Sequence, residues 1–193
     1  MRNKLHMKDF VMGLLRKNLS KFNYYHDIDH TLYVIDKVVE IGAHENCTET
    51  EMELLCTAAL WHDTGYIYTY TGHEEESCIL AKAYLPSYGY TSDEVYAICG
   101  MIMATKIPQT PQNILEEIIA DADLEYLGSA DAAVKAENLF KELHHLNPLL
   151  TREQWNETQI SFLQQHKFFT KYCKQNTEPE KQAYLEKLLQ VVR

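Results

Sequence analysis

The sequence predicts an all-α fold, and three observations support this prediction. Apolar residues recur at the 3.6-residue period of amphipathic helices along most of the chain. No run of alternating apolar and polar residues, the pattern typical of a half-buried strand, is convincing. Glycine (7) and proline (5) are scarce, so long regular elements are expected. The 193 residues suit one domain, 1–193, with a sizeable buried core.

The first three helices are predicted from their apolar faces and their starts. Residues 8–19 and 29–43 each place apolar side chains on one face at helical spacing. A third helix, over about 49–62, begins after Thr48 or Thr50. Acidic residues fill its first turn, where the positive end of the helix dipole favours them.

The rest of the chain continues in the same way. The sequence "GHEEESCILAKAYLPSYG" predicts a fourth helix that ends near Pro86, and "TSDEVYAICGMIMATK" predicts a fifth. Two of these later helices start with a capping box, Thr91 with Glu94 and Thr151 with Gln154. Residues 67–71, "IYTYT", are β-prone but too few to change the fold class. The remaining predicted helices cover residues 111–120, 129–145, 151–175 and 178–192.

Composition excludes several classes of protein. With 18 basic and 28 acidic residues the net charge is −10, which disfavours a nucleic acid polymer as a partner. No apolar stretch is long enough for a membrane span, and the N-terminus lacks the apolar segment of a secretory signal, so a cytoplasmic location is expected. The five cysteines form no CxxC motif and are expected to be thiols rather than disulfides.

Two segments carry residues suited to a metal site. "TAALWHDTGY" is an apolar helix that ends on His62 and Asp63, and a buried pair of this kind needs a partner such as a divalent cation. The alternative is a core histidine followed by an aspartate that caps the next turn. "EEIIADADLEYLG" inserts Asp121 and Asp123 into an apolar run, where they could also cap a following helix.

These segments, together with His30 in "HTLYV", resemble the HD superfamily of metal-dependent phosphohydrolases. The resemblance lies in the ordered set of a histidine, a His-Asp doublet after an alanine-rich helix, and a late aspartate in "DADLEYLG". It covers about residues 24–128. The helices of residues 129–193 are expected to pack on this motif-bearing core. The fold implied is the helical bundle of the HD-domain and phosphodiesterase type.

The resemblance implies a set of metal ligands: His30, His62, Asp63 and Asp121. Asp121 is favoured because the first aspartate of this pattern holds the metal in relatives, which leaves Asp123 as a cap or an orienting residue. Residues 95–115 contain no histidine, so a single divalent ion is expected rather than two. Imidazole and carboxylate ligands together accept Mn, Fe, Co, Ni, Zn or Mg.

The stretch "YHDIDH" places His26 one helical turn before His30. In the cyclic-nucleotide phosphodiesterase branch of the superfamily a histidine at this spacing protonates the leaving oxygen. The resemblance therefore makes His26 a candidate general acid, with a substrate-contacting or orienting role as the alternative. Asp27 stands where that branch has asparagine and has no assigned role, and Asp29 is expected to cap the helix.

Three further residues have candidate roles near the doublet. His73 is expected on the substrate side or in an orienting role, and Glu74, like Asp63, is a candidate general base. Lys106 could place a positive charge on a phosphate, with an exposed lysine at a helix end as the alternative.

The predicted function is a metal-dependent phosphohydrolase that cleaves a phosphomonoester or phosphodiester of a small molecule, a nucleotide being the favoured substrate. The alternative is a regulatory module that binds a metal or a nucleotide without catalysis. Oxygenase chemistry, known among two-metal relatives, is disfavoured by the missing histidines. A homodimer is one expectation for the assembly, and the sequence leaves the oligomeric state and the metal open.

Overall fold

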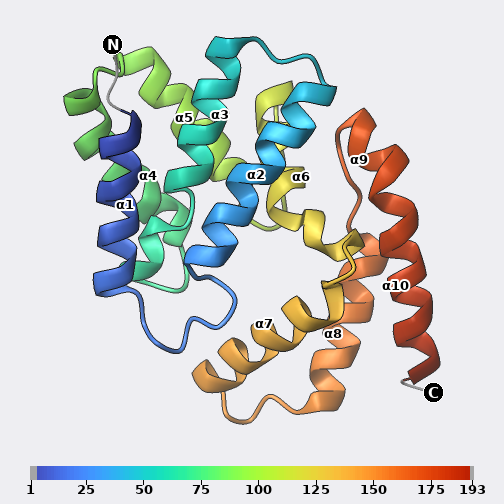
Figure 1. Ribbon diagram of the computed structural model, residues 1–193. Coiled ribbons are helices and arrows are strands. Elements are labelled where there is room, and N and C mark those ends of the chain that lie inside the picture. Colours follow the sequence, from blue (N-terminus) through green and yellow to red (C-terminus); the bar gives the residue numbers. More distant parts are fainter. Residues whose placement is uncertain (1–3, 192–193) are drawn as a thin grey trace.

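The protein, described here by a computed structural model over residues 4–191, is built of helices joined by turns and short loops (Figure 1). Residues 4–191 contain no strand, which confirms the all-α prediction. Residues 1–3 and 192–193 lie outside the described part, and so does the last residue of the predicted helix 178–192. The elements are α1 (Lys4–Asn18), α2 (Ile28–His44), α3 (Glu49–Trp61), η1 (Thr64–Ile67), α4 (His73–Tyr84), η2 (Leu85–Tyr88), α5 (Ser92–Ala104), α6 (Ile114–Leu124), η3 (Glu125–Gly128), α7 (Ala132–Leu146), α8 (Arg152–Gln165), α9 (Lys171–Asn176) and α10 (Glu178–Val191).

The first six α-helices share one hydrophobic core. α2 packs against α3 and α6, and α5 packs against α3, α4 and α6. α3 is buried along most of its length and contributes the fully buried Trp61 at its last residue. Because α2, α3 and α6 contact one another, side chains near the ends of these helices can meet at one point.

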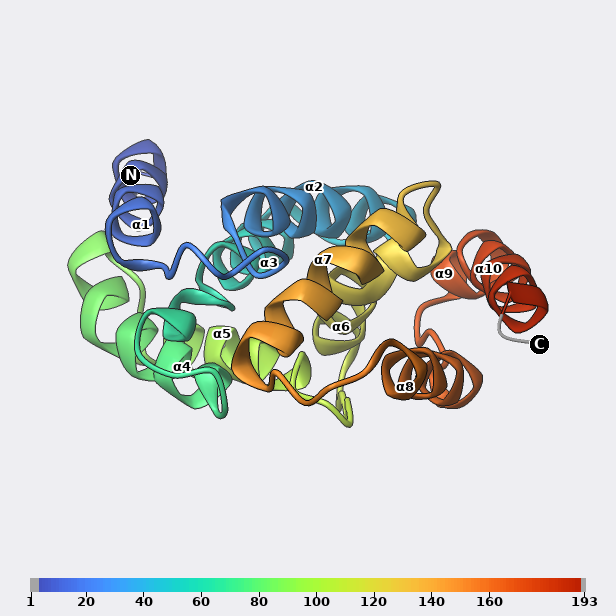
Figure 2. The same cartoon turned by 90° about the horizontal axis from the view of Figure 1, so that it is seen from below.

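The last helices surround a second, smaller apolar cluster. Its buried members include Leu127 of η3, Leu163 of α8 and Leu185 of α10. α10 contacts η3, α8 and α9, and α7 contacts η3. α1 and α10 lie at opposite ends of the molecule. α7 runs beneath α6 away from α10, and the loop after it returns the chain to α8 (Figures 1 and 2).

The predicted helix starts are largely confirmed. Capping boxes are present at Thr48 with Glu51, at Thr91 with Glu94 and at Thr151 with Gln154. The cap predicted at Asp29 is wrong. Asp27 is the N-cap of α2, because its backbone is extended and its side chain accepts a hydrogen bond from the backbone N–H of His30, whereas Asp29 lies in the first turn.

Three predicted segments differ from the structure. The helix predicted over 151–175 is interrupted, because α8 ends at Gln165 and α9 begins at Lys171. The helix predicted over 111–120 continues as α6 to Leu124, so that Asp121 and Asp123 are both helical. The β-prone residues 67–71 end η1 and form a turn.

No helix among residues 4–191 combines the length and the apolar character needed to cross a bilayer. The described residues contain no disulfide; the cysteines are Cys47, Cys56, Cys78, Cys99 and Cys173.

Candidate metal centre

Three helix ends bring four candidate ligands together. His30 lies in the first turn of α2, and the cap at Asp27 fixes that turn with a 2.9 Å hydrogen bond to the His30 N–H. His62 and Asp63 directly follow α3, where the chain turns into η1. Asp123 lies in the last turn of α6. The site therefore depends on the mutual packing of α2, α3 and α6.

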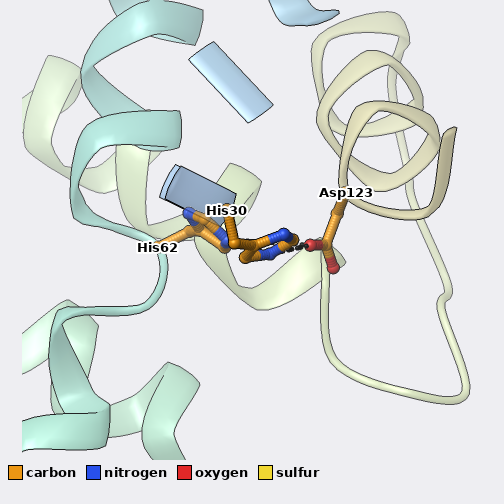
Figure 3. Close-up of side chains that lie close together, drawn as sticks. All are labelled: His30, His62 and Asp123. Atoms are coloured by element: carbon orange, nitrogen blue, oxygen red, sulfur yellow. Dashed lines mark hydrogen bonds and ion pairs between the residues drawn. The ribbon is translucent and has the colours of Figure 1, made fainter. Parts of the chain in front are cut away.

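The potential ligand atoms are close together (Figure 3). His30 Nε2 lies 3.0 Å from Asp123 Oδ1 and 3.4 Å from His62 Nε2. His62 Nε2 lies 3.6 Å from the same Asp123 oxygen. One atom from each of these three residues falls within 4.8 Å of the others, an arrangement that could hold a metal ion.

Asp63 lies beside both histidines, although the three-residue group just described does not include it. Its Oδ2 atom is buried without a hydrogen-bond partner, and it lies 3.2 Å from His62 Nε2 and 3.4 Å from His30 Nε2. Ligands bonded to one ion at about 2.0–2.2 Å are themselves about 2.8–3.6 Å apart in tetrahedral or octahedral geometry. The measured separations fit this range, so the donor set present suits a divalent cation.

The orientation of His62 also fits a ligand. Its Nδ1–H donates to the backbone carbonyl of Ala59 over 2.8 Å, which leaves the lone pair on Nε2, the atom that faces the cluster. A histidine placed only for packing would not need both carboxylates near that nitrogen. The alternative of an ordinary core histidine is therefore disfavoured by its surroundings.

The structure corrects the choice between the two aspartates of α6. Asp121 accepts hydrogen bonds from the backbone N–H of Phe169 (2.8 Å) and Thr170 (2.8 Å) and from the Thr170 hydroxyl (2.7 Å). Its carboxylate is thus committed to the segment between α8 and α9, and it is Asp123 that contacts His30. The structure thus brings Asp123, expected to act as a cap or an orienting residue, beside the histidines, and it does not bring the expected ligand Asp121 there.

The charges of the cluster support one another. Burial alone would lower the pKa of His62, but without a cation Asp63 and Asp123 outweigh it and raise that pKa well above its usual value. A cation bound at Nε2 would take the place of that proton. Burial would raise the pKa of each aspartate, yet His62 lowers the pKa of Asp63, and His30 and His62 lower that of Asp123. The buried carboxylates are therefore ionised, as ligands of a cation must be.

His26 lies beside the cluster and has a partner that the sequence did not indicate. Its Nδ1 is 2.5 Å from Glu142 Oε1, and Glu142 Oε2 accepts the backbone N–H groups of Tyr25 and His26. Burial would lower the pKa of His26, but the hydrogen bond that its Nδ1 donates to the Glu142 carboxylate, together with the charges of Asp63 and Glu142, outweighs burial and the pKa is raised. The charged form of His26 is therefore favoured relative to a free imidazole.

Glu142 could have been suspected from its position on α7. It follows Leu139 by three residues and precedes Leu146 by four, so a carboxylate falls on an apolar helical stripe. Its partner, however, is 116 residues away in the sequence. No local pattern names that partner.

His73 and Glu74 lie at the start of α4, on the edge of the cluster. His73 Nε2 is 3.5 Å from Asp63 Oδ1, and its ring stacks on Tyr66 with centroids 3.9 Å apart. Tyr66 also stacks on His26, at 4.3 Å, and the rings of His26 and His73 are themselves 6.1 Å apart. Glu74 is buried, with a carboxylate oxygen 3.6 Å from His73 Nδ1.

Lys106 is farther out. It follows α5, its side chain is 43% exposed, and it forms an ion pair with Glu75. It lines the same cavity as His26, Asp63, His73 and Asp123, whose volume is about 480 Å³. This value is within the range of about 300–1,000 Å³ that is usual for small-molecule sites. A larger hollow of about 1,100 Å³, along α8, includes none of the candidate ligands.

Comparison with known proteins identifies the family and the fold. The family model of the HD domain matches residues 27–125, which is more than half of the chain. Among solved structures, a predicted HD superfamily hydrolase from an uncultured Thermotogales bacterium superposes with a TM-score of 0.66. It is 21% identical, and the match covers 95% of this chain and 90% of that one. No curated protein matches the sequence.

A helical fold with a His-His-Asp cluster that could hold a metal ion is what the structure adds to the match with the HD-domain model. The chain belongs to the HD-domain superfamily. The resemblance seen in the sequence is thereby confirmed. His26 and Glu142, which form the pair beside the cluster, both lie outside the matched residues.

Proposed function

We propose that this protein is a phosphohydrolase that uses one divalent metal ion, held by His30, His62, Asp63 and Asp123, to cleave a phosphoester of a small molecule. The observation that carries the proposal is the group of ligand atoms 3.0–3.6 Å apart at the wall of a cavity. Mixed imidazole and carboxylate ligands are compatible with Mn, Fe, Co, Ni, Zn or Mg.

A divalent ion at this position would polarise a phosphoryl oxygen and lower the pKa of a bound water molecule. The chain's own contribution begins with charge. Two ionised aspartates and two histidines would hold the ion. No arginine lines the cavity, so no guanidinium group could supply the positive charge in its place. Recognition of the phosphate therefore depends on the metal end of the cavity, with Lys106 able to contribute if it leaves Glu75.

His26 is the proposed proton donor. Glu142 holds Nδ1 and favours the charged ring, which leaves Nε2 to donate a proton to the departing oxygen. Tyr66 stacks on the ring and restricts its rotation. Glu142 is a positioning residue in this scheme, because it acts through His26.

Asp63 and Glu74 are the proposed candidates for the base that accepts a proton from the attacking water. Asp63 is close enough to the histidines to act within the cluster, and Glu74 is buried on the cavity wall. His73, 3.5 Å from Asp63, would orient that carboxylate or contact the substrate.

The test combines metal analysis with a screen of phosphomonoesters and phosphodiesters. Purified protein should bind one divalent ion and hydrolyse an ester only with that ion, and chelator should remove both properties. His62→Ala and Asp63→Ala should lose the ion while keeping the helical circular-dichroism spectrum. Metal binding without hydrolysis of any ester would support the regulatory module instead, and absence of metal binding would refute the proposal.

The role of His26 has its own signature. His26→Ala should slow esters with poor leaving groups by about 10²-fold or more, while 4-nitrophenyl phosphate, whose leaving group needs no proton, should be much less affected. Glu142→Gln should show the same pattern more weakly. An equal loss for both kinds of ester would contradict general-acid catalysis. A nucleotide substrate, a homodimer and a cytoplasmic location stay predictions.

A further inference from the structure

The cavity beside the cluster has two chemically different ends. The metal end contains all the histidines and charged residues that line the cavity: His26, Asp63, His73, Glu74, Lys106 and Asp123. The other end is enclosed by η3, α7, α8, α10 and the end of α6. The residues that line it include Ala136, Leu139, Leu143, Trp155, Gln159 and Tyr184.

No residue of this far end is charged, and most are apolar or aromatic. Several belong to the second hydrophobic cluster, so part of that cluster faces a cavity instead of being closed. A ligand with an ionised group there would lose its hydration without gaining a counter-charge, at a large cost in free energy. An apolar group would gain about 25 cal/mol for each Å² removed from water.

The polar atoms at the far end are few. Gln159 Oε1 accepts a hydrogen bond from the Tyr184 hydroxyl over 3.2 Å. Trp155 lines the cavity and is only 5% exposed, and its buried indole N–H has no acceptor. Buried indole N–H groups usually have a partner, so this donor suits one acceptor on a bound molecule.

Cations are equally scarce along the whole cavity. Lys106 is the only lysine or arginine in the lining, and it is already paired with Glu75. A substrate with several phosphates would therefore depend on the metal for nearly all of its charge neutralisation. The lining is better suited to a single phosphate at the metal end.

We propose that the substrate is a phosphomonoester of an apolar, ring-containing alcohol, whose organic part occupies the far end of the cavity. This inference rests on the proposed hydrolase function and specifies its substrate class. Most of the specificity is then supplied by residues 126–184, beyond the part of the chain that the HD family model matches. A nucleoside or a polyol would place several hydroxyl groups against the leucine side chains of α7.

Three monoesters of primary alcohols, whose leaving groups are alike, test the substrate class: 2-(2-naphthyl)ethyl phosphate, adenosine monophosphate and glycerol 3-phosphate, each with Mn²⁺-loaded protein. The value of kcat/KM for the naphthyl ester should exceed the other two at least tenfold. Ala136→Leu, which fills the apolar end, should reduce this preference at least tenfold. Ala133→Leu is the matched control, because Ala133 is exposed on the same helix and should keep the preference.

A second pair of variants tests the same inference if Ala136→Leu does not fold. Leu143→Asn places an amide in the half-buried lining, and Leu146→Asn makes the same change at a side chain of α7 that is 54% exposed. Only Leu143→Asn should reduce the preference for the naphthyl ester. A preference for adenosine monophosphate or glycerol 3-phosphate, or equal effects of the paired variants, would overturn the inference.

Calorimetric binding separates this inference from the proposed function. If no ester is hydrolysed, the hydrolase proposal fails, but 2-(2-naphthyl)ethyl phosphate should still bind the wild-type protein and bind Ala136→Leu at least tenfold more weakly. Binding that ignores Ala136→Leu, or no binding of the naphthyl ester, would refute the apolar site whether or not another ester is cleaved.

Discussion

At the scale of single residues, two aspartates of one helical turn have different tasks. Asp123 faces the histidines, while Asp121 accepts three hydrogen bonds from Phe169 and Thr170. Burial raises the pKa of Asp121 to about 6, although the hydrogen bonds from Thr170 and Phe169 oppose this shift. Its carboxylate therefore holds the chain between α8 and α9, and it does not contribute to the cluster.

Alanine substitutions should separate these tasks. Asp123→Ala should abolish stoichiometric metal binding and change the helical content little. Asp121→Ala should keep the metal but lower the free energy of unfolding by about 2–4 kcal/mol, because buried N–H groups lose their acceptor. Metal analysis and urea denaturation of both variants provide the check. Loss of metal in Asp121→Ala with full stability would contradict the assignment.

His166 predicts a pH dependence of stability. Burial, followed by the nearby Lys181 amine, lowers its pKa to about 4, and Glu178 opposes this only in part. Because the unfolded chain takes up the proton near pH 6.5 and the folded chain does not, stability conferred by neutral His166 is full above about pH 7 and is lost as pH falls toward 4. The loss is at most about 3 kcal/mol.

The measurement is the free energy of unfolding between pH 7 and 4 for wild type and for His166→Asn. The asparagine keeps an acceptor for the Lys181 amine, which lies 3.3 Å from His166 Nδ1. The variant should lose less stability than wild type over this range. Parallel curves for the two proteins would show that His166 does not cause the dependence.

At the scale of elements, the approach of η1 to α4 sets the second side of the site. A side chain at Gly65 would place its Cβ 1.9 Å from the backbone oxygen of His73, so only glycine allows these elements to touch. The Gly65 N–H also donates to the Ser77 hydroxyl over 2.8 Å. This contact places His73 next to Asp63.

Gly65→Ala should therefore destabilise the protein by more than about 2 kcal/mol, because backbone must move to admit the methyl group. Gly13→Ala is the control within the same chain, since a Cβ there meets nothing within 4 Å and Gly13 lies inside α1. It should stabilise by about 0.5–1 kcal/mol. Thermal unfolding compares the two, and a similar effect of both would refute the packing argument.

At the scale of the whole molecule, the proposed ligands connect α2, the end of α3 and α6. An ion bound only by the folded chain stabilises it by about 2.7 kcal/mol at a concentration 100 times its Kd. For a protein of this length that corresponds to a rise in Tm of about 5–10 °C. Chelator should reverse the rise.

Differential scanning fluorimetry with and without Mn²⁺ measures this shift. Asp123→Ala should show none of it, while Asp121→Ala should show it from a lower starting Tm. A shift of equal size in Asp123→Ala would place the ion elsewhere in the molecule.

Much of the fold was predictable because helix signals are local. The capping boxes at Thr91 and Thr151 each occupy four consecutive residues and need no tertiary partner. The break at residues 166–170 was not predictable in this way. The backbone N–H groups of Phe169 and Thr170 donate hydrogen bonds to the Asp121 carboxylate instead of to helix carbonyls. Asp121 lies 48–49 residues earlier in the chain.

The sequence by itself determined the helical class, the family, and the placement of His30, His62 and Asp63 at one site, since their order and local contexts are distinctive. Only the tertiary structure decided between Asp121 and Asp123. Residues two apart on a helix point to nearly opposite sides, about 160° apart. The rotation of α6 about its axis therefore decides which of the two aspartates faces the histidines. That rotation, like the pairing of Glu142 with His26, is set by packing between segments far apart in the chain, which a local pattern does not encode.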